Sequence, residues 1–192
     1  DYGSFCVFYK NSPIIIDVGC MSYDPKSKDF NKGKSAKEHS TLLLDNKSLV
    51  QPYDISMSKF QLKKSKVNHE IGINHIKLSG KTINLIEWSR ILRIRDDSEI
   101  EIVNKISSND NVNYHENFYI SNSLKYLTKG ENSIIFLCED SKINFLFDKV
   151  IDTEILDAED YANYGEIEKI YRISNKGIVS NKEIKSAVKI LK

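Results

Sequence analysis

Turn-forming residues recur about every eight to twelve residues through much of this chain, with short apolar segments between them. Three examples are residues 11–13 (Asn-Ser-Pro), 96–98 (Asp-Asp-Ser) and 129–132 (Lys-Gly-Glu-Asn). This spacing is typical of antiparallel strands in two packed sheets. The sequence therefore predicts an all-β fold, an antiparallel β-sandwich of supersandwich-like form, with residues 1–192 as one domain.

Alternation of side-chain character supports individual strands. In residues 4–10, Phe5, Val7 and Tyr9 alternate with the other side chains, as in a half-buried strand. Residues 99–106 alternate acidic and aliphatic side chains, as in a strand with one wet face. We also expect turns at residues 79–81 and 175–177 and a polar loop at residues 157–164. Further strands are predicted at residues 14–16, 41–44, 60–64, 67–73, 75–78, 82–88, 90–95, 112–120, 133–138, 142–147, 150–156 and 166–174, and residues 184–191 fit a strand or a helix.

The charge balance and hydropathy exclude some classes of partner. The chain has 28 Lys and Arg against 27 Asp and Glu, a net charge of +1. A nucleic-acid-binding surface would require a strongly basic face. A transmembrane helix would require about eighteen consecutive apolar residues, and the sequence has no such run. We therefore expect neither nucleic acid nor a membrane as a partner.

The cysteines do not indicate a disulfide framework. The chain has an odd number of cysteines, Cys6, Cys20 and Cys138, and no two of them form a Cys-x-x-Cys pair. Cys6 is out of phase with Phe5 and Val7, which places it on the opposite face of their strand. We predict free thiols.

Asp17 and His39 are the best candidates for a chemical site. The β-branched run Ile14-Ile15-Ile16 ends at Asp17, and His39 precedes the next predicted strand after a long polar segment. Carboxylate oxygen and imidazole nitrogen are ordinary zinc ligands, but such a site needs at least three protein ligands and the sequence offers two. The alternative for His39 is a histidine at a strand entrance that is satisfied by hydrogen bonds.

The motifs around these two residues resemble the β-sandwich domain of the heparinase II/III-like polysaccharide lyases. In chain order they are Asp1-Tyr2-Gly3-Ser4-Phe5, Ile16-Asp17-Val18-Gly19, Tyr23, Lys34-Ser35 and His39-Ser40-Thr41. The likeness is close over residues 1–45 and extends beyond them in the rhythm of strands. The chain departs from the family pattern at Ser40, where the family has Asn, and at residues 34–36, where it often has Arg-Ser-Thr.

The resemblance implies a role for four residues. Asp17 and His39 correspond to ligands of a mainly structural zinc ion, whose third ligand is expected just upstream of Asp1. Tyr23 and Lys34 are the candidate substrate-binding residues, Tyr23 by stacking on a sugar and Lys34 by attracting a uronate carboxylate. Each residue also has a simpler interpretation: Tyr23 as a loop tyrosine packed on the sheet, and Lys34 as a solvated lysine.

The resemblance also implies the activity of a longer parent protein. Such a parent cleaves uronate-containing polysaccharide, such as a glycosaminoglycan, by β-elimination. Its catalytic Tyr and His lie mostly on an N-terminal α-helical toroid, which this sequence does not contain. We therefore assign no catalytic residue here, expect the fragment alone to be inactive, and expect an acidic polysaccharide and the parent's own helical domain as partners.

Several other residues receive structural interpretations. His69 and His75 lie in neighbouring predicted strands and form a weaker metal-pair candidate, for which solvated strand histidines are the alternative. His115 has the same alternative. Trp88, the single Trp, is interpreted as core or groove wall, and Arg90 as an ion-pair partner on a sheet face.

Two other functions remain open from the sequence. One is a non-catalytic carbohydrate-binding sandwich that uses Tyr and Trp side chains, and the other is a purely structural sandwich. A lyase of this kind is expected in the periplasm or outside the cell, and the sequence carries no signal segment that decides the compartment.

Overall fold

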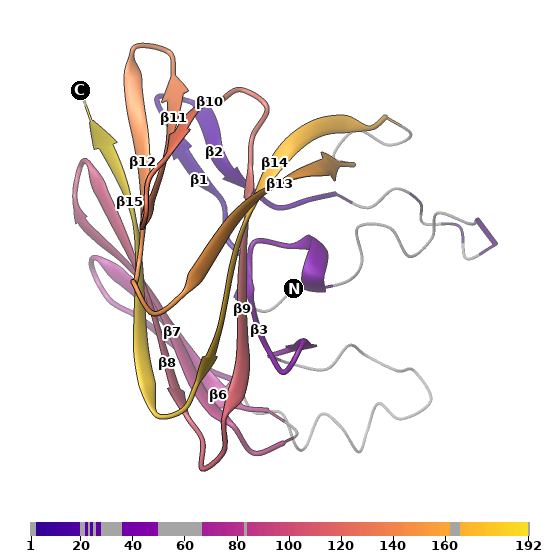
Figure 1. The fold of residues 1–192 in the computed structure, drawn as a ribbon, viewed down its shortest axis with the longest axis vertical. Coiled ribbons are helices and arrows are strands. Elements are labelled where there is room, and N and C mark those ends of the chain that lie inside the picture. The colour runs from indigo at the N-terminus through magenta and orange to yellow at the C-terminus, as the bar shows by residue number, and fades with distance from the viewer. Residues whose placement is uncertain are drawn as a thin grey trace.

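The computed structural model describes residues 3–19, 22, 24, 26–27, 36–49, 67–82, 84–161 and 166–191. These residues form two antiparallel β-sheets that pack face to face, which confirms the predicted sandwich (Figure 1). The helical element in this part of the chain is the short 3-10 helix η1 (Ala36–Glu38). No helix among the described residues has the length and apolar character needed to cross a membrane.

We name each sheet after one of its central strands. In the β9 sheet the path is β1-β2-β9-β14-β13, and β3 pairs with both β9 and β4. In the β8 sheet the order is β10-β11-β12-β15-β8-β7-β6-β5. The strands of the β9 sheet are β1 (Val7–Tyr9), β2 (Ser12–Ile16), β3 (Leu42–Leu44), β4 (Lys47–Ser48), β9 (Val112–Ile120), β13 (Asp152–Asp160) and β14 (Glu168–Val179). Those of the β8 sheet are β5 (Val67–Ile71), β6 (His75–Lys81), β7 (Glu87–Asp96), β8 (Glu99–Ser107), β10 (Lys125–Lys129), β11 (Ser133–Cys138), β12 (Ser141–Phe147) and β15 (Lys182–Leu191).

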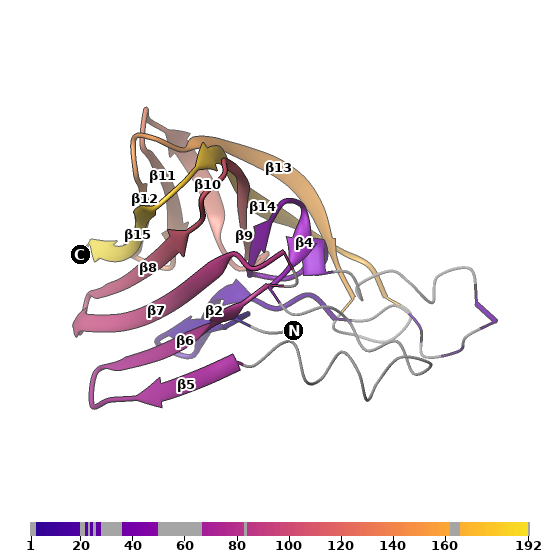
Figure 2. The same ribbon diagram turned by 90° about the horizontal axis from the view of Figure 1, so that it is seen from below.

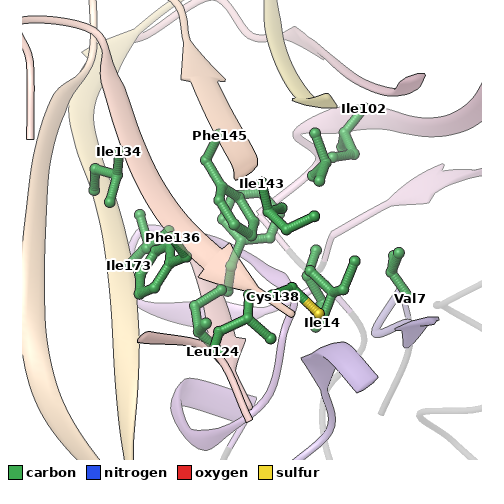
Figure 3. Packing of buried hydrophobic residues seen from close by; sticks show 14 of the residues in the cluster. Val7, Ile14, Ile102, Leu124, Ile134, Phe136, Cys138, Ile143, Phe145 and Ile173 are labelled. Atoms are coloured by element: carbon green, nitrogen blue, oxygen red, sulfur yellow. The ribbon is translucent and has the colours of Figure 1, made fainter. Parts of the chain in front are cut away.

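The core between the sheets has two apolar clusters. The larger one joins Phe118 of β9 to Phe136 and Phe145 of the β8 sheet, and the last two rings meet edge to face with centroids 5.7 Å apart. Figure 3 shows Phe136, Phe145 and Ile143 packed with Ile173 and other aliphatic side chains. The second cluster contains Trp88, Tyr114 and Leu42, so Trp88 is a core residue, one of its two predicted roles.

Alternation along β9 gives the sheet two different faces. Tyr114 and Phe118 point into the core clusters, whereas Tyr119 belongs to a separate cluster with Val18 and Ile170. Because side chains alternate along a strand, His115 and Asn117 share the outer face with Tyr119. Figures 1 and 2 show η1 on this outer side of the β9 sheet, away from the β8 sheet.

Some predicted boundaries are wrong. Residues 79–81 lie inside β6 and residues 175–177 inside β14, and residues 157–160 extend β13. Asn175 is a buried side chain that hydrogen-bonds between strands, so its polar character does not indicate a turn. Residues 87–96 form one continuous strand, preceded by a turn at Leu85, which has a positive φ of 64°. Strand β10 was not predicted, and the strand predicted at residues 60–64 lies outside the described residues.

Candidate functional site

Asp17 and His39 meet in space, as the sequence pattern suggested. Asp17 directly follows β2, and His39 directly follows η1. His39 Nδ1 lies 2.8 Å from Asp17 Oδ1, a hydrogen-bonding distance. The His39 side chain is 8% exposed and that of Asp17 is 32% exposed. The pair therefore joins the end of one strand to the entrance of another at a largely covered position.

Hydrogen bonds fix the Asp17 side chain and the backbone next to His39. Ser4 Oγ donates to Asp17 Oδ2 at 3.1 Å. Ser40, the residue after His39, donates from Oγ to the carbonyl of Ile16 at 2.8 Å and accepts from the amide of Tyr119 at 2.9 Å. Ser40 thus ties β2, β9 and the His39 backbone together. This gives a structural role to a position where the sequence departs from the family pattern.

Two outer-face side chains of β9 hold η1 on the sheet. The carbonyl of Lys37 accepts one hydrogen bond from Asn117 Nδ2 and another from the Tyr119 hydroxyl, each at 2.9 Å. The backbone N–H of Asn117 also donates to the carbonyl of Thr41 at 3.0 Å. Sequence reasoning did not single out Asn117 or Tyr119. Their signal is the row of polar side chains that alternates with core residues along residues 113–119.

The surroundings favour the ionised form of Asp17. Burial on its own raises the pKa of the carboxyl group. The hydrogen bond and charge of His39, together with the hydrogen bond from Ser4, outweigh this and bring the pKa of Asp17 below its usual value. Asp17 is therefore a carboxylate at neutral pH, the form that a metal ion requires.

The donor types of the pair fit zinc, and the set is incomplete. Two ligands on one tetrahedral zinc, each about 2.0 Å from it, lie about 3.3 Å apart. A small separation of the Asp17 and His39 side chains from their 2.8 Å contact would reach this distance. Within the described residues no group of three or more His, Cys, Asp and Glu side chains gathers. A third protein ligand would therefore come from elsewhere.

The other predicted site residues fall outside this geometry. Tyr23 and Lys34, the candidate substrate-binding residues, lie outside the described residues, as does Asp1. His69 and His75 are on adjacent strands, but the register pairs His69 with Leu78, and the ring of His75 lies 3.5 Å from Glu70.

Arg90 forms an ion pair on a sheet face, as predicted, and that face is the one buried between the two sheets. Its Nη1 lies 3.2 Å from Glu116 Oε1, and the two side chains are 1% and 0% exposed. Glu116 also accepts hydrogen bonds from buried side chains of both sheets, namely Asn104, Tyr114, Asn175 and Ser186. This polar network crosses the core between the two sheets.

Solved structures share this fold over the whole chain. Heparan sulfate lyase HepC from Pedobacter heparinus has a TM-score of 0.75 at 17% identity, over 100% of this chain and 30% of its own. The heparinase III that is the BT4657 gene product has a TM-score of 0.75 at 15% identity, again over 100% of this chain and 30% of its own. A further heparinase III structure has a TM-score of 0.70 at 13% identity, over 100% of this chain and 29% of its own.

These matches establish the fold and leave the activity open. No protein-family model matches the chain, and no curated protein matches it in sequence. The chain spans 29–30% of the length of the three lyase structures named above. The resemblance stated from residues 1–45 is confirmed at the level of the fold: the chain has the β-sandwich fold that forms part of heparan sulfate lyase HepC and of heparinase III.

Proposed function

We propose that this chain is the C-terminal β-sandwich domain of a polysaccharide lyase that cleaves uronate-containing acidic polysaccharide by β-elimination. The observation that carries the proposal is the contact between Asp17 and His39. These are the two residues to which the lyase resemblance assigns a shared site. The fold of the whole chain supports the same conclusion, since it is that of part of heparan sulfate lyase HepC.

β-Elimination divides the work between two parts of such a protein. The uronate carboxylate must be neutralised, a base must remove the C5 proton, and an acid must protonate the leaving oxygen. In this proposal the base and the acid lie on a helical domain of the longer protein. The sandwich contributes the outer face of the β9 sheet, on which η1 and the Asp17–His39 pair are held.

Asp17 and His39 would hold a zinc ion at the edge of that face, together with a third ligand just upstream of Asp1. When bound, the ion supplies a rigid cross-link between the end of β2 and the entrance to β3. The residues of this chain already favour that arrangement. Ser4 orients the carboxylate of Asp17, and Ser40 fixes the backbone next to His39.

The test is an activity assay on the longer protein that contains this chain. It is incubated with heparan sulfate, with hyaluronan and with a neutral glucan, and the near-ultraviolet absorbance of unsaturated uronate products is followed. Absorbance that rises with an acidic substrate and stays constant with the neutral glucan supports the proposal. Binding of the acidic polymers without new absorbance indicates instead a carbohydrate-binding sandwich. Absence of both contradicts the lyase and the binding function.

Two variants connect the activity to the site. His39→Ala is expected to lower the rate, because it removes one side of the contact that fixes the β2 and β3 ends. His69→Ala is the matched control, since this exposed histidine lies on β5 at the edge of the other sheet. Equal rates for both variants would mean that the Asp17–His39 pair does not contribute to the reaction.

A further inference from the structure

The outer face of the β9 sheet carries a group of polar and cationic side chains next to the Asp17–His39 site. On β9 these are His115 and Tyr119, and on β14 they are Arg172, Ser174 and Lys176. The strand register pairs Tyr119 with Arg172 and His115 with Lys176. We call these five residues the outer-face cluster. Because Tyr119 also donates its hydroxyl hydrogen to the carbonyl of Lys37 in η1, the cluster is continuous with the segment that carries His39.

Arg172 is the unusual member of this cluster. Its Nη1 donates one long hydrogen bond of 3.4 Å to the Tyr119 hydroxyl, and its guanidinium lies 6.0 Å from the centre of the Tyr119 ring. Its Nε is buried and has no hydrogen-bond partner among the described residues. Arginine has five N–H donors, and carboxylates are their usual partners in proteins. Two described acids act on this cluster. Glu154 bridges Lys176 at 2.8 Å and its charge also reaches Arg172, and the charge of Glu38 in η1 acts on Tyr119.

The charge around His115 is positive. Burial, followed by the charges of Lys176, Arg172 and Lys37, lowers the pKa of His115 below its usual value. The ring is held in place, since His115 Nε2 and Ser174 Oγ share a hydrogen bond of 2.8 Å. The acids that face the cluster from β13 are Glu154, which is committed to Lys176, and Asp152, which is opposite Lys176 in the register. Glu38 of η1 faces Tyr119 from the other side. Arg172 forms no ion pair within the described residues, so a bound anion would be attracted to its guanidinium.

We propose that Arg172, Tyr119 and His115 form a subsite for one carboxylate or sulfate group of an acidic polysaccharide. Arg172 supplies the planar pair of N–H donors that matches two oxygens of such a group, and the Tyr119 ring supports the guanidinium from one side. The choice of a polysaccharide as the source of the anion rests on the proposed function. The subsite itself rests on the incomplete hydrogen bonding of Arg172 and the surrounding cations.

The experiment is an NMR titration of the 192-residue chain that follows the His115 ring signals. The probes are inorganic sulfate, a short heparan sulfate oligosaccharide and an uncharged cello-oligosaccharide. The two anionic probes are expected to shift the His115 signals and raise its pKa, since a nearby negative charge favours the imidazolium form. The uncharged oligosaccharide is expected to do neither. Anionic probes that leave the His115 ring unchanged overturn the proposal.

Arginine variants identify the group that binds. Arg172→Ala is expected to weaken oligosaccharide binding about tenfold to hundredfold, the loss typical of charge-assisted hydrogen bonds. Arg172→Lys keeps the charge without the fork and is expected to recover part of the affinity. Arg95→Ala is the matched control, an exposed arginine on the other sheet. If Arg172→Lys and Arg172→Ala both fold and bind as the unmodified chain does, the subsite does not exist.

The outcomes separate this inference from the proposed function. Binding of sulfate and oligosaccharide at His115, combined with no elimination product from the longer protein, would contradict the lyase proposal and support the anion subsite. Elimination activity whose kcat and KM are both unchanged in Arg172→Ala would support the lyase proposal and contradict the subsite. A rise in KM with kcat preserved supports the subsite as a substrate-binding element of the lyase.

Discussion

Arg90 and Glu116 pair across the interior of the sandwich, with Arg90 Nη1 3.2 Å from Glu116 Oε1 and neither side chain more than 1% exposed. Arg90 belongs to β7 of one sheet and Glu116 to β9 of the other. The ring of Phe5 lies 5.2 Å from the guanidinium carbon, so the cation also has an aromatic neighbour. The pair and its hydrogen-bonded partners therefore fix how the two sheets sit on one another.

The first prediction is that breaking this pair strongly destabilises the fold. Arg90→Met leaves Glu116 as a buried carboxylate without its cation, and we expect a loss of about 3–5 kcal/mol in the free energy of unfolding. Urea denaturation followed by circular dichroism measures the loss. Arg95→Met is the control, because the Arg95 side chain is exposed and its partner Glu101 keeps Arg93, so the substitution should cost less than about 1 kcal/mol.

A double variant tests whether the two charges act as a unit. Arg90→Met combined with Glu116→Leu is expected to recover part of the stability lost in Arg90→Met alone, since it leaves no isolated buried charge. Full recovery is not expected, because Asn104 and Asn175 would each lose a Glu116 partner. Additive losses would mean that the pair has no coupling and that the cost lies in packing alone.

The strands that the sequence predicts well are those whose alternation is complete. The predicted bounds 133–138 agree with β11, and 142–147 agree with β12 to within one residue, because buried and less buried side chains alternate along both strands. The turn predicted at residues 175–177 is wrong because the interior itself is polar there. Asn175 and Glu116 are buried and hydrogen-bonded to each other, so hydrophobicity alone gives no sign that they face inward. Strand pairing decides their orientation, and it becomes visible once the partner strands are known.

For the site, the sequence predicted the contact between Asp17 and His39, and it did not predict the residues that hold η1 in place. Asp17 and His39 stand out because each lies at a strand boundary and each is a metal-ligand type. Asn117 and Tyr119, which anchor η1, are distant from His39 in the sequence and reach it through the pairing of β3 with β9. Arg172 likewise joins the outer face through β14. Such groupings depend on sheet order, which single-sequence patterns do not specify.

The second prediction concerns the anchoring of η1. Asn117→Ala removes the side-chain donor to the carbonyl of Lys37, and we expect a loss of about 1–2 kcal/mol and faster amide hydrogen exchange in residues 39–42. Asn113→Ala is the matched control on the same strand, because Asn113 is exposed. Exchange that accelerates equally in both variants would mean that Asn117 does not hold this segment.

The third prediction is a pH dependence from His115. Burial and three nearby cations hold the pKa of His115 in the folded protein below the ordinary histidine value of about 6.5, so on acidification the unfolded chain takes up this proton first. Stability is therefore lost as pH falls from about 7 through the ordinary histidine range, and the loss stops once the folded-state pKa is passed. Because His115 is only partly buried, solvent screens these charges and the loss is expected to be small.

His115→Gln removes this titration while offering an amide to Ser174. The variant is expected to lose less stability than the unmodified chain between about pH 7 and pH 5. Urea midpoints across this range provide the comparison, with His69→Gln as the control for removing one imidazole. If acidification instead stabilised the unmodified chain relative to His115→Gln, the pKa of His115 would be raised on folding. That result would contradict the lowered pKa described for His115.

The fourth prediction is zinc retention by the longer protein. A site with Asp17, His39 and a third ligand should keep about one zinc ion per chain through dialysis, measured by atomic emission. Asp17→Asn and His39→Ala should each lose it, because a tetrahedral site with oxygen and nitrogen ligands does not persist with one protein ligand removed. Chelation should also lower the melting temperature of the unmodified protein and leave that of Asp17→Asn constant. His69→Ala, which alters an exposed histidine on β5, should retain the metal. If both site variants retained zinc as fully as His69→Ala does, the 2.8 Å contact between Asp17 and His39 would be a hydrogen bond between a strand end and a strand entrance, with no metal to replace it.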